Sequence, residues 1–207
     1  FKAYTLLSIN PPQCSIKKFS KDETMSKLKQ IILYSCVAIF ALGAGSFLRT
    51  LLSEAYQTEL SSEESQQGAQ AILSASLPDL QGENQEISQW LGKVMVVNFW
   101  ATWCTPCREE IPEFIEAQKE YGEQGLIFIG IAIDQADKVK MFSQEFGINY
   151  PVLVGGFNTW SLLEAAGNRH SALPYTVVIN RSGKLVENYL GRVDLKKLEK
   201  MVIPLLN

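Results

Sequence analysis

Two cysteines, Cys104 and Cys107, are separated by only two residues in the segment FWATWCTPC. An apolar run, Met95–Trp100, precedes them and indicates a strand buried on both faces, and a helix is predicted from Thr105 to Gly122. Unpaired N–H groups and the dipole at a helix start stabilise an anion. Cys104 is therefore predicted to have a lowered pKa and to be the attacking sulfur.

Cys107 lies one turn inside this helix. Ile111, Phe114 and Ile115 follow it at helical spacing, so Cys107 begins the apolar face. A shielded second thiol can attack a mixed disulfide formed on Cys104 and release the reduced substrate. The predicted chemistry is thiol–disulfide exchange through a redox-active Cys104–Cys107 disulfide, without a further cofactor or a metal.

The elements around this pair predict a single α/β domain. Leu126–Ile133 is a second buried strand, and Gly82-Glu83-Asn84 is the turn of a small hairpin before the first strand. The remaining predicted elements are a helix at Asp137–Phe146, an extended segment at Pro151–Val154, a helix at Thr159–Ala166, paired strands at Tyr175–Ile179 and Lys184–Leu190, and a last helix capped by Asp194. This order favours a central mixed, mostly parallel sheet with an antiparallel edge, flanked by helices.

The segment VVNFWATWCTPCREEIPEF, with Leu173-Pro174 before YTVVIN, resembles thioredoxin-fold proteins and most closely their membrane-anchored TlpA/ResA branch. The likeness extends from about Leu77 to the C-terminus and implies a thioredoxin-like fold. It implies that Pro174 is a cis-proline facing the cysteines. The substrate-binding residues expected beside them are Trp103, Thr105, Pro106, Leu173 and Pro174.

The proton acceptor for Cys107 has to be sought away from the usual position. Many thioredoxins carry a buried aspartate six residues before the first cysteine, whereas this chain has Asn98, and an amide cannot take that proton. Glu110 lies three residues after Cys107, close on the helix surface, where the resembling branch often has an acidic residue. We expect Glu110 to be the catalytic base, with its pKa raised by partial burial.

The N-terminal region predicts a membrane anchor. Residues 31–48 contain no charged side chain, lysines precede them, and glutamates follow. The positive-inside rule then places the N-terminus in the cytoplasm and the catalytic domain on the extracytoplasmic side of a bacterial inner membrane. A cleaved signal peptide is the alternative, and it leads to the same compartment.

The sequence predicts that the chain is divided into four segments. Residues 1–24 are expected to be a non-native upstream extension or a disordered cytoplasmic segment, because Met25 begins a typical membrane-targeted sequence. Residues 25–52 form the predicted transmembrane segment, residues 53–70 a polar tether, and residues 71–207 the thioredoxin-like domain.

The expected function is reduction of disulfides in exported proteins, and the resemblance suggests apocytochrome c as a substrate and a membrane thiol-transporting protein as the electron donor. A disulfide-introducing oxidase remains an alternative. A peroxiredoxin-like enzyme is a second one, although Ala101 stands where a Thr or Ser is needed; a non-catalytic or copper-binding module that uses His170 is a third. With one histidine a zinc site is disfavoured, and a net charge of −3 gives no reason to expect nucleic acid.

Overall fold

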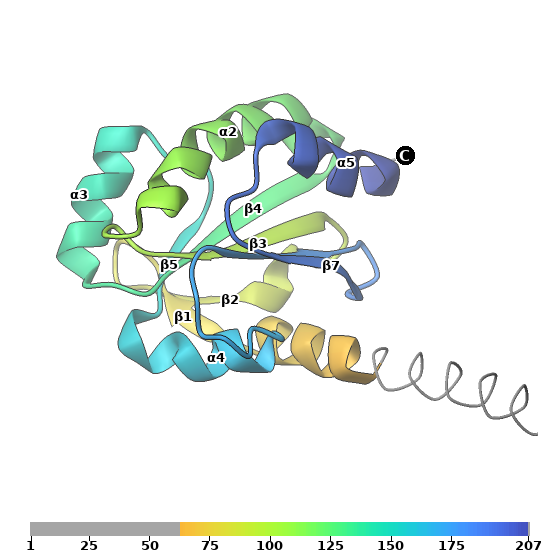
Figure 1. The fold of residues 1–207 in the computed structure, drawn as a ribbon, viewed down its shortest axis with the longest axis horizontal. Coiled ribbons are helices and arrows are strands. Elements are labelled where there is room, and N and C mark those ends of the chain that lie inside the picture. Colours follow the sequence, from red (N-terminus) through yellow and green to blue (C-terminus); the bar gives the residue numbers. More distant parts are fainter. Residues whose placement is uncertain (1–62, 207) are drawn as a thin grey trace, which may run out of the picture. The chain divides into compact units, whose positions relative to one another are not determined.

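The computed structural model describes residues 63–206, which contain a five-stranded sheet in the order β5-β4-β3-β6-β7 (Figure 1). Its strands are β3 (Val94–Trp100), β4 (Leu126–Ala132), β5 (Val152–Val154), β6 (Tyr175–Ile179) and β7 (Leu185–Leu190). A separate two-stranded sheet pairs β1 (Ser76–Pro78) with β2 (Asn84–Glu86). This pair confirms the predicted hairpin, and Gly82 provides its left-handed turn residue with φ 87°.

The two central strands are buried along their whole length. Every residue of β3 and of β4 is shielded from solvent, because helices cover both faces of the sheet. β3 runs parallel to β4 and antiparallel to β6, β4 runs parallel to β5, and β6 runs antiparallel to β7. The sheet is therefore mixed, as predicted, and its antiparallel pairings lie on the β6–β7 side.

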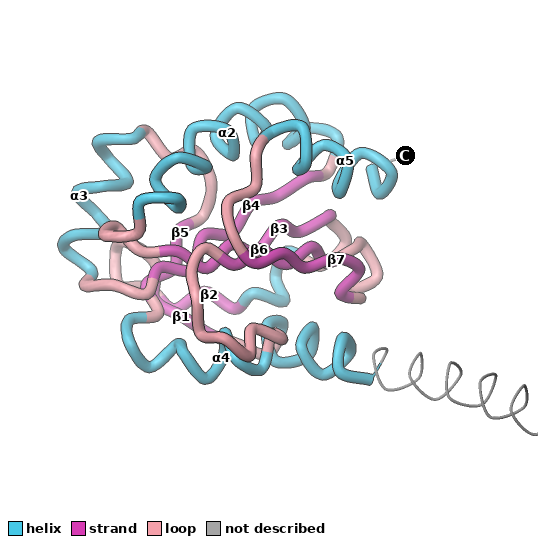
Figure 2. Tube along the Cα trace, viewed as in Figure 1, coloured by secondary structure: helices cyan, strands magenta, loops and turns pink. Residues whose placement is uncertain are grey.

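Helices cover both faces of this sheet (Figure 2). They are α2 (Thr105–Tyr121), α3 (Ala136–Phe146), α4 (Trp160–Ala165) and α5 (Leu195–Leu206), with 3-10 turns η1 (Ile87–Trp90), η2 (Gly122–Gln124) and η3 (Gly156–Thr159). α2, α3 and α5 pack on one face, and α4 with a helix at residues 63–73 packs on the other. Side chains of β3 alternate between these layers: Val96 and Trp100 face α2, whereas Val97 and Phe99 face the opposite layer.

The domain includes residues that the sequence had suggested were a polar tether. Residues 63–73 are helical, and Gly68, Ala69 and Ile72 are buried against the rest of the domain. A Cβ at Gly68 would lie 3.2 Å from the Ala165 carbonyl oxygen, so the helix approaches α4 closely. The prediction of a tether through Gln70 is therefore wrong for residues 63–70, where the small Gly68 and Ala69 make the contact.

The predicted anchor, residues 25–52, lies outside the described residues. Among residues 63–206, no helix has the length and apolar character needed to cross a membrane.

Candidate active site

The loops around the cysteines meet at one edge of the sheet. The β3–α2 loop follows Trp100, the β4–α3 loop follows Ala132, and these two residues are register partners. Tyr175, the first residue of β6, pairs with Phe99 on one side and with Leu190, the last residue of β7, on the other. The loop that carries Pro174 and the loop between β7 and α5 therefore open at the same edge as Cys104.

The two cysteines form a disulfide and occupy unequal positions. Cys104 is the N-cap of α2, its Sγ accepts a hydrogen bond from the Cys107 N–H at 3.3 Å, and Arg108 N–H donates to its carbonyl oxygen. Cys104 keeps 6% of its surface exposed, whereas Cys107 is completely buried. Only Cys104 is therefore open to an incoming sulfur, and its Sγ already receives the N–H bond that would stabilise a thiolate.

A buried aspartate fixes the loop before Cys104. Asp134 is 3% exposed, and its Oδ2 accepts hydrogen bonds from the backbone N–H of Thr102 at 3.2 Å and from the Thr102 hydroxyl at 2.5 Å. Its Oδ1 accepts a bond from the Gln135 N–H. One carboxylate thus connects the β3–α2 and β4–α3 loops two residues before the nucleophile.

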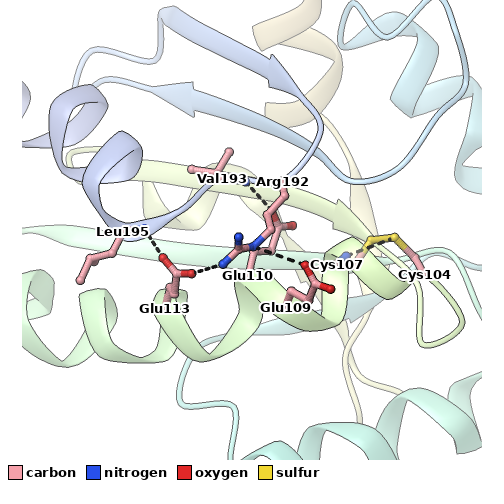
Figure 3. Close-up of polar contacts among 8 residues, drawn as sticks. All are labelled: Cys104, Cys107, Glu109, Glu110, Glu113, Arg192, Val193 and Leu195. Carbon is pink, nitrogen blue, oxygen red and sulfur yellow. Dashed lines mark hydrogen bonds and ion pairs between the residues drawn. A yellow bond between two sulfur atoms is a disulfide. The ribbon is translucent and has the colours of Figure 1, made fainter.

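Glu110 lies one turn after Cys107 on α2, where it is completely buried (Figure 3). Asn98 of β3 donates from Nδ2 to Glu110 Oε1 at 2.8 Å and to the Thr176 hydroxyl oxygen at 3.1 Å. The backbone N–H of Val193 donates to Glu110 Oε2 at 2.9 Å. Both carboxyl oxygens are therefore held, one by the sheet and one by the β7–α5 loop.

Burial dominates the acidity of this carboxyl group. Removal from water raises the pKa of Glu110 from its ordinary value of 4.5 to about 8, against the lowering effect of the Val193 and Asn98 bonds and of the Arg192 charge. This pKa is close to that of an ordinary thiol, about 8.5. The proton affinity of Glu110 is therefore closer to that of an ordinary thiol than the affinity of an exposed carboxyl group is.

The Leu173–Pro174 peptide bond is cis, as the resemblance implied. Pro174 is buried and Leu173 is half-buried. Asn168, which is 2% exposed, organises the preceding loop: its Nδ2 donates to the Ala172 carbonyl oxygen at 2.7 Å, and its Oδ1 accepts from the His170 N–H.

The other predicted contact residues are on the surface. Trp103 is 59% exposed, and Thr105 and Pro106 are exposed on the first turn of α2. The structure thus brings Trp103, Thr105 and Pro106 next to Cys104, and their role in substrate binding stays a prediction.

His170, which the copper alternative used, is exposed in the loop before Pro174. Among residues 63–206, no group of three or more His, Cys, Asp and Glu side chains is placed to hold a metal ion.

Sequence reasoning missed Asp134, Thr102 and Asn168. A signal for Asp134 was present, because it follows a buried parallel strand directly, and such strands end at the same edge of a sheet. The contact from Val193 had no such signal, since a backbone N–H carries no residue-type information.

Comparisons with known proteins agree with this geometry. A model of the AhpC/TSA family matches residues 68–188. The thiol-disulfide oxidoreductase ResA of Halalkalibacterium halodurans is 32% identical over 137 residues, which are 65% of this chain and 74% of that protein. The thioredoxin-like protein YneN of Bacillus subtilis is 30% identical over 151 residues, 70% of this chain and 84% of that protein.

A solved structure gives the same assignment. The crystal structure of a thiol:disulfide interchange protein of the thioredoxin family from Chlorobium tepidum TLS superposes with a TM-score of 0.59 at 30% identity, covering 65% of this chain and 94% of that one. The predicted thioredoxin-like fold is thereby confirmed. The chain belongs to the AhpC/TSA family, and within it to the thioredoxin-like thiol–disulfide oxidoreductases that are similar to ResA.

Proposed function

We propose that this protein reduces disulfides in exported proteins, with Cys104 as the attacking and Cys107 as the resolving sulfur. The observation that carries the proposal is the asymmetry of the pair: Cys104 caps α2 and reaches solvent, whereas Cys107 is buried one turn before Glu110. A stabilised thiolate that solvent can reach and a shielded second thiol are the two groups that a disulfide reductase needs.

The reaction transfers two electrons in two exchanges. The Cys104 thiolate attacks a substrate disulfide, forms a mixed disulfide and releases one substrate thiolate. Cys107 then gives its proton to the Glu110 carboxylate and attacks Cys104 Sγ, which releases the second substrate thiolate and leaves the Cys104–Cys107 disulfide. The proposed membrane thiol-transporting donor restores the dithiol, and protonated Glu110 returns its proton to Cys107 as that sulfur leaves.

The reduction potential of the pair tests the direction of electron flow. The full-length chain is equilibrated with glutathione buffers, and the fraction of Cys104–Cys107 disulfide is measured after acid quenching. A potential near about −270 mV supports the reductase, and a value near about −120 mV replaces it with the disulfide-introducing oxidase.

Trapping tests the order of attack. Cys107→Ser should accumulate a mixed disulfide between Cys104 and its substrate, because the resolving thiol is gone. Cys104→Ser is the matched control and should trap nothing. Equal trapping by both variants contradicts the assigned roles.

The proposed location has a separate test. If the domain lies on the extracytoplasmic side of the inner membrane, a membrane-impermeant thiol reagent should label Cys104 in intact, briefly reduced cells. Labelling only after lysis would place the domain inside. Among trapped proteins, apocytochrome c is the substrate that the family resemblance leads us to seek first.

A further inference from the structure

Among the described residues, the only backbone hydrogen bond to the Glu110 carboxyl comes from the loop between β7 and α5. A second glutamate of α2, Glu113, holds this loop on either side of the donor. Glu113 Oε1 pairs with the Arg192 guanidinium at 2.5 Å, and its Oε2 accepts a hydrogen bond from the Leu195 N–H. Val193, whose N–H donates to Glu110, lies between Arg192 and Leu195 in the chain (Figure 3).

We propose that Glu113 is a positioning residue: by holding Arg192 and Leu195, it keeps the Val193 N–H on Glu110 Oε2. This inference rests on the proposed role of Glu110 as proton acceptor. It extends the site by one helical turn, to a residue that contacts neither cysteine.

The geometry explains why Glu113 suits this task. It stands three residues after Glu110 on α2, so its side chain leaves the helix on nearly the same face. Leu195 provides the first N–H of α5, a group that lacks a partner within its own helix. Glu113 therefore caps a second helix from α2. The more exposed Glu109 contributes only a longer contact to Arg192, at 3.7 Å.

Several groups act on the Glu110 carboxyl at once. From its own helix there is the Glu113 charge, and from the loop there is the Arg192 charge. Tyr150, near the start of β5, interacts electrostatically with Glu110.

Asn98 of β3 donates to Glu110 and also to Thr176 of β6. These neighbours are unchanged by a substitution of Glu113. The Val193 bond and the Arg192 charge are the two influences on Glu110 that depend on where the loop lies.

A positioning role and a purely electrostatic role of Glu113 predict opposite changes in the pKa of Glu110 when Glu113 is removed. As a like charge, Glu113 raises the pKa of Glu110, so its removal by itself lowers that pKa. As a positioning residue, Glu113 keeps a hydrogen bond that favours the ionised carboxylate, so its removal raises the pKa. The sign of the change distinguishes the two.

The experiment is a titration of the Glu110 side-chain carboxyl by ¹³C NMR in the full-length oxidised chain, with the resonance assigned by its loss in Glu110→Gln. In Glu113→Ala we expect the pKa of Glu110 to rise by about one unit, the value of one hydrogen bond to a charged group. Glu113→Gln should give a smaller rise, because its amide oxygen can still accept from Leu195 while its pairing with Arg192 is lost. Glu116→Ala, at an exposed glutamate of the same helix, is the matched control and should change nothing.

A pKa that falls or stays constant in both Glu113 variants overturns the proposal. The Gln variant preserves side-chain volume and covers the case in which the Ala variant fails to fold. The titration measures the pKa of the Glu110 carboxyl and not turnover. Failure of the Glu113 proposal can therefore be distinguished from failure of the proposed catalytic role of Glu110. That failure would appear as an unchanged pH–rate curve in Glu110→Gln.

Discussion

At the scale of single residues, Glu110 shows two opposing influences on one carboxyl group. Burial away from water disfavours its charge, while Asn98, Val193 and Arg192 favour it, and burial prevails because the pKa rises to about 8. Neither the helix position nor the residue type determines this balance. The result is a group that is mostly protonated at neutral pH while Cys104 and Cys107 are joined.

The raised pKa has a consequence for stability that can be measured. The folded protein keeps a proton on Glu110 between pH 4.5 and about 8, where the unfolded chain has lost it. The contribution of this proton to the free energy of unfolding is complete below pH 4.5 and is lost as pH rises through 8. Between pH 5 and 8, Glu110 should lower the free energy of unfolding by on the order of 3 kcal/mol. Urea unfolding of oxidised Glu110→Gln should show a flatter pH dependence.

Glu116→Gln serves as the control for that comparison, since this exposed glutamate lies on the same helix. If Glu110→Gln and wild type lose stability in parallel from pH 5 to 8, the carboxyl group is not protonated in the folded protein.

The sequence predicted part of this site and could not predict the rest. The unequal positions of Cys104 and Cys107 followed from the predicted helix start and its apolar face, and Glu110 followed from helical spacing and the family resemblance. Its partner Val193 lies 83 residues further along the chain and acts through the backbone. Only the fold brings the two together.

At the scale of elements, Asp134 connects two loops that contribute to the same edge of the sheet. Asp134→Ala would leave the N–H and hydroxyl of Thr102 without their acceptor, which costs about 1–3 kcal/mol and loosens the loop before Cys104. We expect a lower free energy of unfolding and a several-fold slower alkylation of reduced Cys104. Urea unfolding and iodoacetamide kinetics measure the two effects.

Asp137→Ala is the matched control, because Asp137 is exposed in the first turn of α3. Asp134→Asn should recover part of the lost rate, since its amide oxygen can still accept from Thr102. Equal alkylation rates in Asp134→Ala and Asp137→Ala would mean that the loop holds its shape without Asp134.

The elements that carry large apolar side chains were predicted well, and the N-terminal helix was not. β3 and β4 were recognised as buried runs, and Asp194 caps α5 as expected, its Oδ1 accepting from the Lys197 N–H. The helix at residues 63–73 was missed because its polar sequence contains few large apolar residues. It packs through Gly68 and Ala69, whose small size permits contact but gives no hydrophobic pattern.

At the scale of the whole molecule, the folded domain includes residues that precede its apolar sequence, which begins near Ala71. A fragment of residues 71–207 lacks most of the N-terminal helix, so Ile72 loses the element that holds it in the core. Full burial of one such side chain is worth about 1.5–3 kcal/mol. We expect this fragment to be less stable by at least that amount than a fragment of residues 53–207.

Thermal and urea unfolding of the two fragments measure the difference. Arg169→Ala in the longer fragment is the control, because it removes only the exposed ion pair with Glu64 and should cost less than about 1 kcal/mol. Equal stability of the two fragments would show that residues 63–70 do not contribute to the folded domain.

The exposure of Thr105 and Pro106 bears on how such an enzyme can evolve. These two residues lie between the cysteines in the sequence and outside the core, so their replacement alters the surroundings of the sulfurs without removing a packed group. Substitutions at these two positions can therefore change the reduction potential of the pair while the fold stays the same. One fold can thus exchange electrons with donors and acceptors of different reduction potential.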